Sequence, residues 1–272
     1  MGVLGDTVRD GCMPKVATVH LLGSPCVTGN GSRLLVPEGS KKLLAFVALH
    51  RDGVERRYAA GSLWPFGCDD RASGNLRSAL WRLRRAGIDI VEGDRWSLRL
   101  DEAVAVDVRQ LFEWSDRVLA GRTNGDDLLI STQHLNGLNL LPGWYDDWVT
   151  IQRERLRQRV LHALELSSTQ LASMGRYSDA VETALIAINA EPMRESAYRT
   201  LMHIHLTESN WIEARRTYAS YRQLTRRELG VDPSSDLRAL LVDARSYPTG
   251  DSGRVIQLPR RNAGRLRSRW LW

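Results

Sequence analysis

The chain has 272 residues, of which 43% are hydrophobic and 26% are charged, a composition that supports a folded core and excludes a wholly disordered chain. Its longest uninterrupted apolar run, Leu43–Leu49, has seven residues, whereas a transmembrane helix needs about 18 or more. The first ten residues include two aspartates where a secretory signal would be basic and then apolar, and the three cysteines form no CxxC pair. We therefore expect a cytoplasmic protein without membrane contact, disulfide framework or zinc site.

The net charge of +6 is distributed unevenly along the chain. Residues 1–100 contain 15 Lys and Arg against 10 Asp and Glu, residues 101–245 contain 17 against 21, and residues 246–272 contain 6 against 1. Two basic ends therefore flank an acidic middle. Such asymmetry is typical of a nucleic-acid-binding module joined to a segment that contacts other partners.

Strand and helix signals follow one another in the basic N-terminal part. Two β-rich runs flank Gly29-Asn30-Gly31, which is the pattern of a β-hairpin with a tight turn. The apolar run Leu43–Leu49 predicts a buried helix, which Ser40 would cap and Asp52-Gly53 would end.

Two further helices and a second hairpin come next. Tyr58–Trp64 predicts a short helix, and Arg71–Arg85 predicts a longer one. Residues 88–100 predict a hairpin that turns at Gly93-Asp94, and the inner face of its return strand should carry Trp96, Leu98 and Leu100. A sheet, three helices and a hairpin in this order predict an α+β winged helix-turn-helix.

The helix Arg71–Arg85 has two contrasting faces. At 100° per residue its apolar side chains form one stripe that should face the core: Ala72, Leu76, Ala79, Leu80 and Leu83. Five arginines and no acid occupy this helix, so its other face favours DNA phosphates through counterion release, and Arg and Asn can read purine edges in the major groove. Gly74 costs about 1 kcal/mol relative to Ala in a helix, which close approach of a DNA strand would explain.

We therefore predict a DNA-binding surface on this helix and on the tip of the second hairpin, where an arginine would contact the minor groove or a phosphate. The candidate residues are Arg71, Asn75, Arg77, Ser78, Trp81, Arg82, Arg85 and Arg95. Two alternatives remain open. The arginines can form an ordinary solvated face, and Trp81 can serve packing rather than DNA contact.

The middle of the chain predicts paired helices with an internal repeat. Tyr177 and Ala180 recur 34 residues later as Trp211 and Ala214, which is the period of the tetratricopeptide repeat. A short closing helix is expected at Leu237–Ala244, and a disordered basic tail should follow it.

The start of the helical middle is rich in aromatic residues. We expect Trp144, Tyr145 and Trp148 to pack at the junction with the winged helix, and direct contact with a partner is the alternative. Because the helical region is net acidic and should repel phosphates, we expect it to bind proteins rather than DNA.

No pattern of catalytic residues, cofactor ligands or metal ligands stands out. The segment 39–42 (GSKK) lacks both the first glycine and the final hydroxyl residue of a phosphate-binding loop. His203 and His205 are two residues apart, so they point to opposed faces of a helix and should not share a metal. We therefore expect no enzymatic activity and no cofactor.

Several stretches resemble one known family. Residues 140–165 (LLPGWYDDWVTIQRERLRQRVLHALE), 176–206 and 221–240 are similar to the bacterial transcriptional activator domain, and residues 76–85 (LRSALWRLRR) resemble the recognition helix that accompanies it. The chain thus resembles the short form of the Streptomyces antibiotic regulatory protein family, in which a winged helix of the two-component response-regulator type precedes that activator domain. The resemblance covers about residues 16–244 and departs from the common pattern in the loop 64–70 and in the short wing.

The resemblance implies activation of a secondary-metabolite gene cluster, such as one for an antibiotic. Proteins of this family bind direct repeats near a promoter as pairs or larger sets and help to recruit RNA polymerase holoenzyme. It therefore implies three partners, which are double-stranded DNA, RNA polymerase and further copies of this chain, and a location at the nucleoid.

We expect four segments: a flexible leader at 1–15, a winged-helix DNA-binding domain at 16–108, an activator domain of tetratricopeptide-like helices at 109–245, and a basic disordered tail at 246–272. The expected function is sequence-specific transcription activation through promoter binding. The alternative is a protein-interaction module, or an anti-activator, whose winged domain does not bind DNA. Only the first should lose DNA affinity steeply as salt rises.

Overall fold

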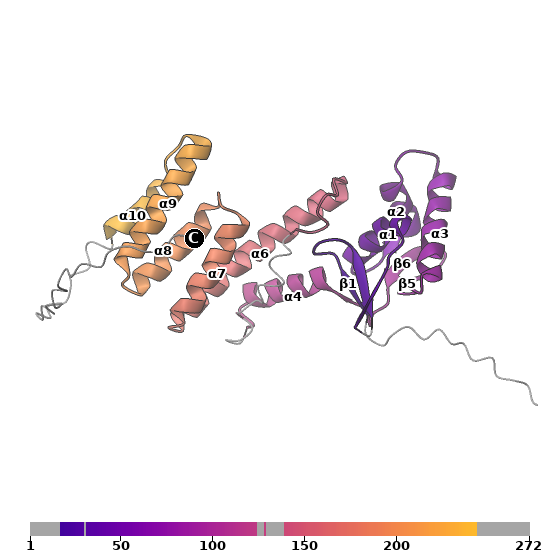
Figure 1. Cartoon of the computed structure of the whole chain (residues 1–272), viewed down its shortest axis with the longest axis horizontal. Helices are drawn as coiled ribbons and strands as arrows, with labels where there is room; N and C mark the ends of the chain where they lie inside the picture. Colours follow the sequence, from indigo (N-terminus) through magenta and orange to yellow (C-terminus); the bar gives the residue numbers. More distant parts are fainter. Residues whose placement is uncertain (1–16, 30, 124–127, 129–138, 244–272) are drawn as a thin grey trace, which may run out of the picture.

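The computed structural model describes residues 17–29, 31–123, 128 and 139–243. The expected leader and basic tail lie outside these residues, as does Ala244 at the end of the predicted closing helix. Figure 1 shows two small sheets with their helices at one end of the molecule and a row of helices at the other. Within the described ranges, none of the helices combines the length and the hydropathy that a membrane span requires.

The N-terminal sheet is built around the first predicted hairpin. Gly29 of one strand pairs with Ser32 of the next, and Gly31 between them has a φ of +76°, which glycine adopts without strain. The predicted hairpin is therefore confirmed. The strands, in the order β3-β2-β1-β7, are Ser32–Leu34, Cys26–Gly29, Ala17–His20 and Ala105–Val106.

Three helices and a second sheet complete the winged helix. The helices α1 (Glu38–Leu49), α2 (Arg56–Leu63) and α3 (Asp69–Arg85) pack against one another. The antiparallel strands β5 (Val91–Gly93) and β6 (Ser97–Leu100) form the second predicted hairpin, which lies beside α3 (Figure 1). The predicted α+β winged helix is thus confirmed. Its second sheet, in the order β4-β6-β5, consists of Val54–Glu55, Ser97–Leu100 and Val91–Gly93.

Ser40 does not cap α1, so that prediction was wrong. The helix begins at Glu38, directly after Pro37, whose φ of −58° suits the start of a helix, and Ser40 is fully buried inside the first turn. The Ser40 hydroxyl donates a hydrogen bond to the carbonyl oxygen of Ala79 over 2.8 Å. Because Ala79 belongs to α3, this hydroxyl joins the two helices.

Trp96 does not lie on the inner face of the second hairpin, although Leu98 and Leu100 do. The two leucines are buried, whereas Trp96 is 67% exposed. The carboxylate of Asp94 accepts hydrogen bonds from the backbone N–H groups of Trp96 and Ser97 over 2.6 and 2.7 Å. These bonds extend the turn through Trp96, so the alternation of inner and outer side chains starts only at Ser97.

The other end of the molecule is a row of helices, each packed against its predecessor. It runs through α4 (Asp107–Leu119), α6 (Asp147–Ser173), α7 (Tyr177–Ala190), α8 (Glu195–Thr207), α9 (Trp211–Leu229) and α10 (Ser235–Asp243).

The predicted repeat is present in this row. Tyr177 and Trp211 are the first residues of α7 and α9 and stand 34 residues apart. Ala180 and Ala214 follow each of them by one turn, and both are fully buried. Small side chains at these positions let the paired helices approach closely, which confirms the tetratricopeptide-like arrangement.

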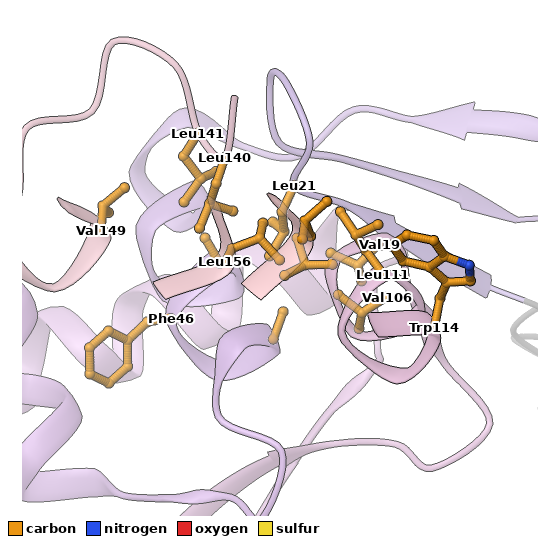
Figure 2. Packing of buried hydrophobic residues seen from close by; sticks show 14 of the residues in the cluster. Val19, Leu21, Phe46, Val106, Leu111, Trp114, Leu140, Leu141, Val149 and Leu156 are labelled. Atoms are coloured by element: carbon orange, nitrogen blue, oxygen red, sulfur yellow. The ribbon is translucent and has the colours of Figure 1, made fainter. Parts of the chain in front are cut away.

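The winged helix and the row of helices share one continuous core. Leu22 forms a β-bridge with Leu140, and the backbone N–H of Leu141 donates a hydrogen bond to the carbonyl oxygen of Leu21 over 3.0 Å. Figure 2 shows Leu21 among the side chains of Leu140, Leu141 and Leu156, all of them fully buried. Burial of these apolar side chains holds the two parts together.

Trp144 and Trp148 pack at this junction as predicted, but Tyr145 does not. Trp148 meets Phe46 of α1 edge to face with ring centroids 5.0 Å apart, and Trp144 lies against Trp148 with centroids 6.3 Å apart. The side chain of Tyr145 is 87% exposed, so it takes no part in the junction core. One side of α1 therefore supports α3, and another side contacts α6.

Candidate nucleic-acid interface

The inner face of α3 is the one that its periodicity predicts. This face packs on α1 and α2, so the opposite face is turned outward at the edge of the molecule far from the row of helices (Figure 1). The buried residues of α3 are Ala72, Leu76, Ala79, Leu80 and Leu83. The outward face is therefore open to a large partner.

This outward face carries guanidinium groups without a counter-charge. Arg71, Arg77 and Arg85 are exposed, and among the residues that the structure describes none of the three forms a hydrogen bond or an ion pair. Ser78 is exposed beside them, and Asn75 is half-buried on the flank. Unneutralised positive charge concentrated on one helix face attracts the phosphates of a nucleic acid.

Trp81 lies on the same outward face and is 58% exposed, so it does not fill the core. The guanidinium group of Arg85 stacks over its indole ring, 5.0 Å from the ring centroid. A stacked guanidinium keeps its N–H groups at the edge of the plane free to donate hydrogen bonds. The pair therefore presents a preoriented hydrogen-bond donor at the C-terminal end of α3.

Arg82 has a different environment from the other predicted arginines. Its Nη2 donates a hydrogen bond to the carbonyl oxygen of Gly39 over 3.0 Å, and its guanidinium covers the position that a Cβ of Gly39 would need. Arg82 therefore fastens α3 to the first turn of α1. The sequence predicted that Arg82 contacts DNA, but this hydrogen bond already occupies one of its N–H groups.

Gly74 occupies an outward position of α3 without any internal reason for glycine. A Cβ added there would meet only Nη2 of Arg77, at 3.8 Å, which is an ordinary contact. The fold itself would therefore tolerate alanine, which is the better helix former by about 1 kcal/mol. The absent side chain leaves space on the outside, where a partner can come close.

The tip of the β5–β6 hairpin holds a second exposed arginine and indole pair. The guanidinium of Arg95 lies over the ring of Trp96, 4.4 Å from its centroid. Hydrogen bonds from the backbone N–H groups of Ser97 and Trp96 lower the pKa of the Asp94 carboxyl, so Asp94 stays ionised and keeps the turn closed. The turn thus holds Arg95 at the end of the hairpin.

A cleft of about 250 Å³ separates α3 from this hairpin. Leu80, Val91 and Leu98 contribute apolar walls, and the indole of Trp81 lies at one side. The basic residues that line the cleft are Arg56, Arg77 and Arg84. The predicted residues Arg77 and Trp81 are thus brought together with two arginines that the prediction did not include.

Arg56 and Arg84 were missed for different reasons. Arg56 starts α2, and it reaches the hairpin because β4, directly before it, pairs with β6. No local pattern in the sequence reveals that pairing. Arg84 belongs to the predicted helix, but its role depends on the hairpin folding back beside α3, so helical periodicity alone gave no reason to choose it.

Metal-binding side chains do not gather anywhere in the described residues, where no group of three or more His, Cys, Asp or Glu is close enough to hold an ion. His203 is exposed and His205 is buried, so the two side chains face different surroundings. Burial away from water lowers the pKa of the His205 imidazole, which favours its neutral form.

A winged helix with an arginine-rich outward helix, joined to paired helical repeats, is the architecture of a transcription regulator. Residues 99–243 match the family model described as the bacterial transcriptional activator domain. Because the match covers more than half of the 272 residues, the chain belongs to this family, and the resemblance to the Streptomyces antibiotic regulatory proteins is confirmed.

A solved structure shares the fold. It is EmbR of Mycobacterium tuberculosis in complex with a low-affinity phosphopeptide, which is 20% identical to this chain and superimposes with a TM-score of 0.63. The likeness covers 84% of this chain but only 65% of EmbR, so the chain spans just under two-thirds of that protein. No curated protein matches the chain.

Proposed function

We propose that this protein binds duplex DNA with sequence specificity through α3 and the β5–β6 hairpin and activates transcription from the promoter it binds. The observation that carries the proposal is the set of exposed guanidinium groups without a counter-charge in the described residues: Arg71, Arg77, Arg85 and Arg95. Their charge is available for DNA, because none of the four forms an ion pair with a carboxylate of the described residues.

The outward face of α3 suits the major groove, which is wide enough for one α-helix. Arg71, Asn75 and Arg85 would read base edges, and Ser78 would support a base or phosphate contact. Arg95 would reach the minor groove or a flanking phosphate from the hairpin tip. Arg82 would contribute mainly by holding α3 on α1, because its Nη2 is engaged with Gly39.

The helical region would supply the contacts for activation. We propose the division into a DNA-binding domain at 16–108 and an activator domain at 109–245, with the second binding RNA polymerase holoenzyme and further copies of the chain on direct repeats. Its arginines are mostly paired with carboxylates, as the ion pairs of α6 to α9 illustrate. The resemblance to antibiotic regulators supports a secondary-metabolite gene cluster as the target and the nucleoid of the cytoplasm as the location.

The test is selection of bound sequences from a random duplex pool by the purified full chain, followed by affinity measurements at several salt concentrations. We expect an enriched direct repeat and an affinity that falls steeply with salt, as phosphate contacts require. An unenriched pool together with salt-independent binding would favour the alternative, a protein-interaction module whose winged domain does not bind DNA.

A further inference from the structure

The cleft between α3 and the β5–β6 hairpin has the size and charge of a site for one anionic group. Its volume of about 250 Å³ lies below the roughly 300–1,000 Å³ of typical small-molecule pockets. Arg56, Arg77 and Arg84 converge on it from two elements, and no carboxylate is among the residues that line it. Arg56 and Arg77 form no ion pair with a carboxylate of the described residues, which favours an anion that enters from outside.

The three arginines are held to different degrees. Nη1 of Arg56 donates a hydrogen bond to the carbonyl oxygen of Asp94 over 3.2 Å, which ties this side chain to the hairpin turn. Nε of Arg84 pairs with Asp89 at 3.3 Å, outside the cleft lining. Arg77 has no polar partner in the described part of the chain. Arg77 is therefore the cation that is most available to a ligand.

The wall opposite α3 is built to leave this space open. A Cβ at Gly93 would lie 2.6 Å from Cδ2 of Leu98 and 3.2 Å from Nη1 of Arg56. Glycine is thus required there for Leu98 to fill the core and for Arg56 to reach the hairpin turn. The hairpin and Arg56 are fitted to each other, and the arginine is placed before any ligand arrives.

We infer that this cleft holds one phosphodiester group of the DNA backbone, with Arg77 as its main ligand and Arg56 and Arg84 as flanking cations. The inference rests on the proposed function, because it concerns the duplex that α3 binds. Guanidinium groups recognise phosphate oxygens with paired hydrogen bonds. A phosphate fixed between helix and hairpin sets how far α3 enters the groove, so Arg77 positions the duplex and does not read its sequence.

The experiment compares the full chain with its Arg77→Ala variant on the selected duplex, with single phosphates replaced one at a time by uncharged methylphosphonates. The affinity of the parent should fall when one particular phosphate in each bound half-site is replaced. The affinity of the variant should not change when that same phosphate is replaced. The variant should also lose the same factor of affinity for operator and for unrelated duplexes. Its log–log salt slope should be smaller by about 0.9, the value for one phosphate contact.

Arg99→Ala is the matched control. Arg99 lies on the same hairpin but outside the cleft, where its Nη2 pairs with Glu92 over 2.8 Å. This variant should keep the salt slope and the methylphosphonate pattern of the parent. Because Arg77 is exposed and makes no polar contact in the described chain, its removal should leave the unfolding temperature unchanged.

Two results would overturn the inference while the proposed function stands. The first is a selected sequence that Arg77→Ala relaxes at one base pair with an unchanged salt slope, which would make Arg77 a base reader. The second is saturation by inorganic phosphate alone of a site on the parent that Arg77→Ala removes, which would assign the cleft to a free anion. Failure of the parent itself to select any sequence would instead contradict the proposed function.

Discussion

The DNA-facing surface of the winged helix, formed by α3 and the hairpin tip, uses arginine differently from the row of helices. In the described part of the helical region, nine arginines form ion pairs with carboxylates: Arg157, Arg159, Arg176, Arg194, Arg199, Arg216, Arg222, Arg226 and Arg227. On α3 and the hairpin tip, Arg71, Arg77, Arg85 and Arg95 have no such partner within the described residues.

The difference lies in clustering as well as in pairing. Arginines of the helical region that lack a carboxylate partner among the described residues are spread along the row: Arg109 and Arg117 belong to α4, Arg122 follows it, Arg153 and Arg155 belong to α6, Arg215 to α9 and Arg238 to α10. Arg109 and Arg153 donate hydrogen bonds to backbone carbonyl oxygens. In the winged helix, Arg71, Arg77, Arg85 and Arg95 lie on the outward face of α3 and at the tip of one hairpin. A cluster of free guanidinium groups generates a local field that attracts phosphates, whereas paired or scattered ones do not. The same residue type therefore serves ligand binding in one region and internal cohesion in the other.

The largest effect should come from separating the two regions. A fragment of residues 1–108 should keep weak sequence-specific DNA binding, because it contains the free arginines, but it should fail to activate transcription. It should also unfold more easily than the full chain, since it exposes Phe46 and Leu21 to water. In vitro transcription with fragment and full chain provides the measurement. Full activation by the fragment would show that the helical region is dispensable.

Breaking a sheltered ion pair of the helical region should cost stability and leave DNA binding intact. Glu165 of α6 accepts hydrogen bonds from Arg194 and Ser196, each over 2.6 Å. Glu165→Gln would leave the guanidinium of Arg194 without its counter-charge and should lower the free energy of unfolding by about 2 kcal/mol. Glu213→Gln, which breaks an exposed pair with Arg216, is the control and should change it by less than about 0.5 kcal/mol.

The free energy of unfolding is measured by denaturant titration, and the affinity for operator DNA is measured on the same preparations of parent, Glu165→Gln and Glu213→Gln. An affinity for DNA that falls in Glu165→Gln, measured where the variant is fully folded, would mean that the two uses of arginine are not separate.

Removing a free arginine from α3 should have the opposite signature. Arg85→Ala should weaken binding to the selected operator by about 1–3 kcal/mol and relax specificity at one base pair, because the lost contact is to a base edge. The unfolding temperature should not change. Repeating the sequence selection with the variant shows whether specificity relaxes, and an unchanged preference would remove Arg85 from the reading surface.

The smallest effect should come from converting paired arginines into free ones. Asp232 pairs with Arg222 and Arg226 over 2.7 Å, and these hydrogen bonds hold the pKa of its carboxyl well below the usual range. Asp232→Asn should free both guanidinium groups and slightly raise affinity for all duplexes at low salt, with no change in sequence preference. Gel-shift titration of parent and Asp232→Asn with an unrelated duplex at low salt measures this rise in affinity.

The pH dependence of this pair follows from the direction of the shift. Because the pKa of Asp232 is lower in the folded chain than in the unfolded one, its contribution to stability is complete above the ordinary carboxyl range and disappears only as pH falls through the folded value. Parent and Asp232→Asn should therefore differ by a constant amount between pH 5 and 8. A difference that grows or shrinks across that range would contradict the assignment.

The sequence predicted the features that depend on neighbours along the chain. The buried stripe of α3, the turn at Gly31 and the repeat phase of Tyr177 and Trp211 all follow from periodicity or turn chemistry. Ser40 and Arg56 escaped prediction, because their roles depend on contacts with α3 and with the second hairpin, which are distant in sequence. The sequence also did not predict which arginines form ion pairs, because tertiary packing decides whether a carboxylate lies close to a given guanidinium group.

The most direct test of the account is the salt dependence of DNA affinity in two fourfold variants of the full chain. One replaces the free arginines Arg71, Arg77, Arg85 and Arg95 with alanine, and the other replaces the paired arginines Arg199, Arg216, Arg222 and Arg227. The account predicts that the first variant loses about 0.9–1.8 from the log–log salt slope, the value for the phosphate contacts of Arg77 and Arg95, and that the second keeps the slope of the parent. Loss of the slope in the second variant, with retention in the first, would contradict it.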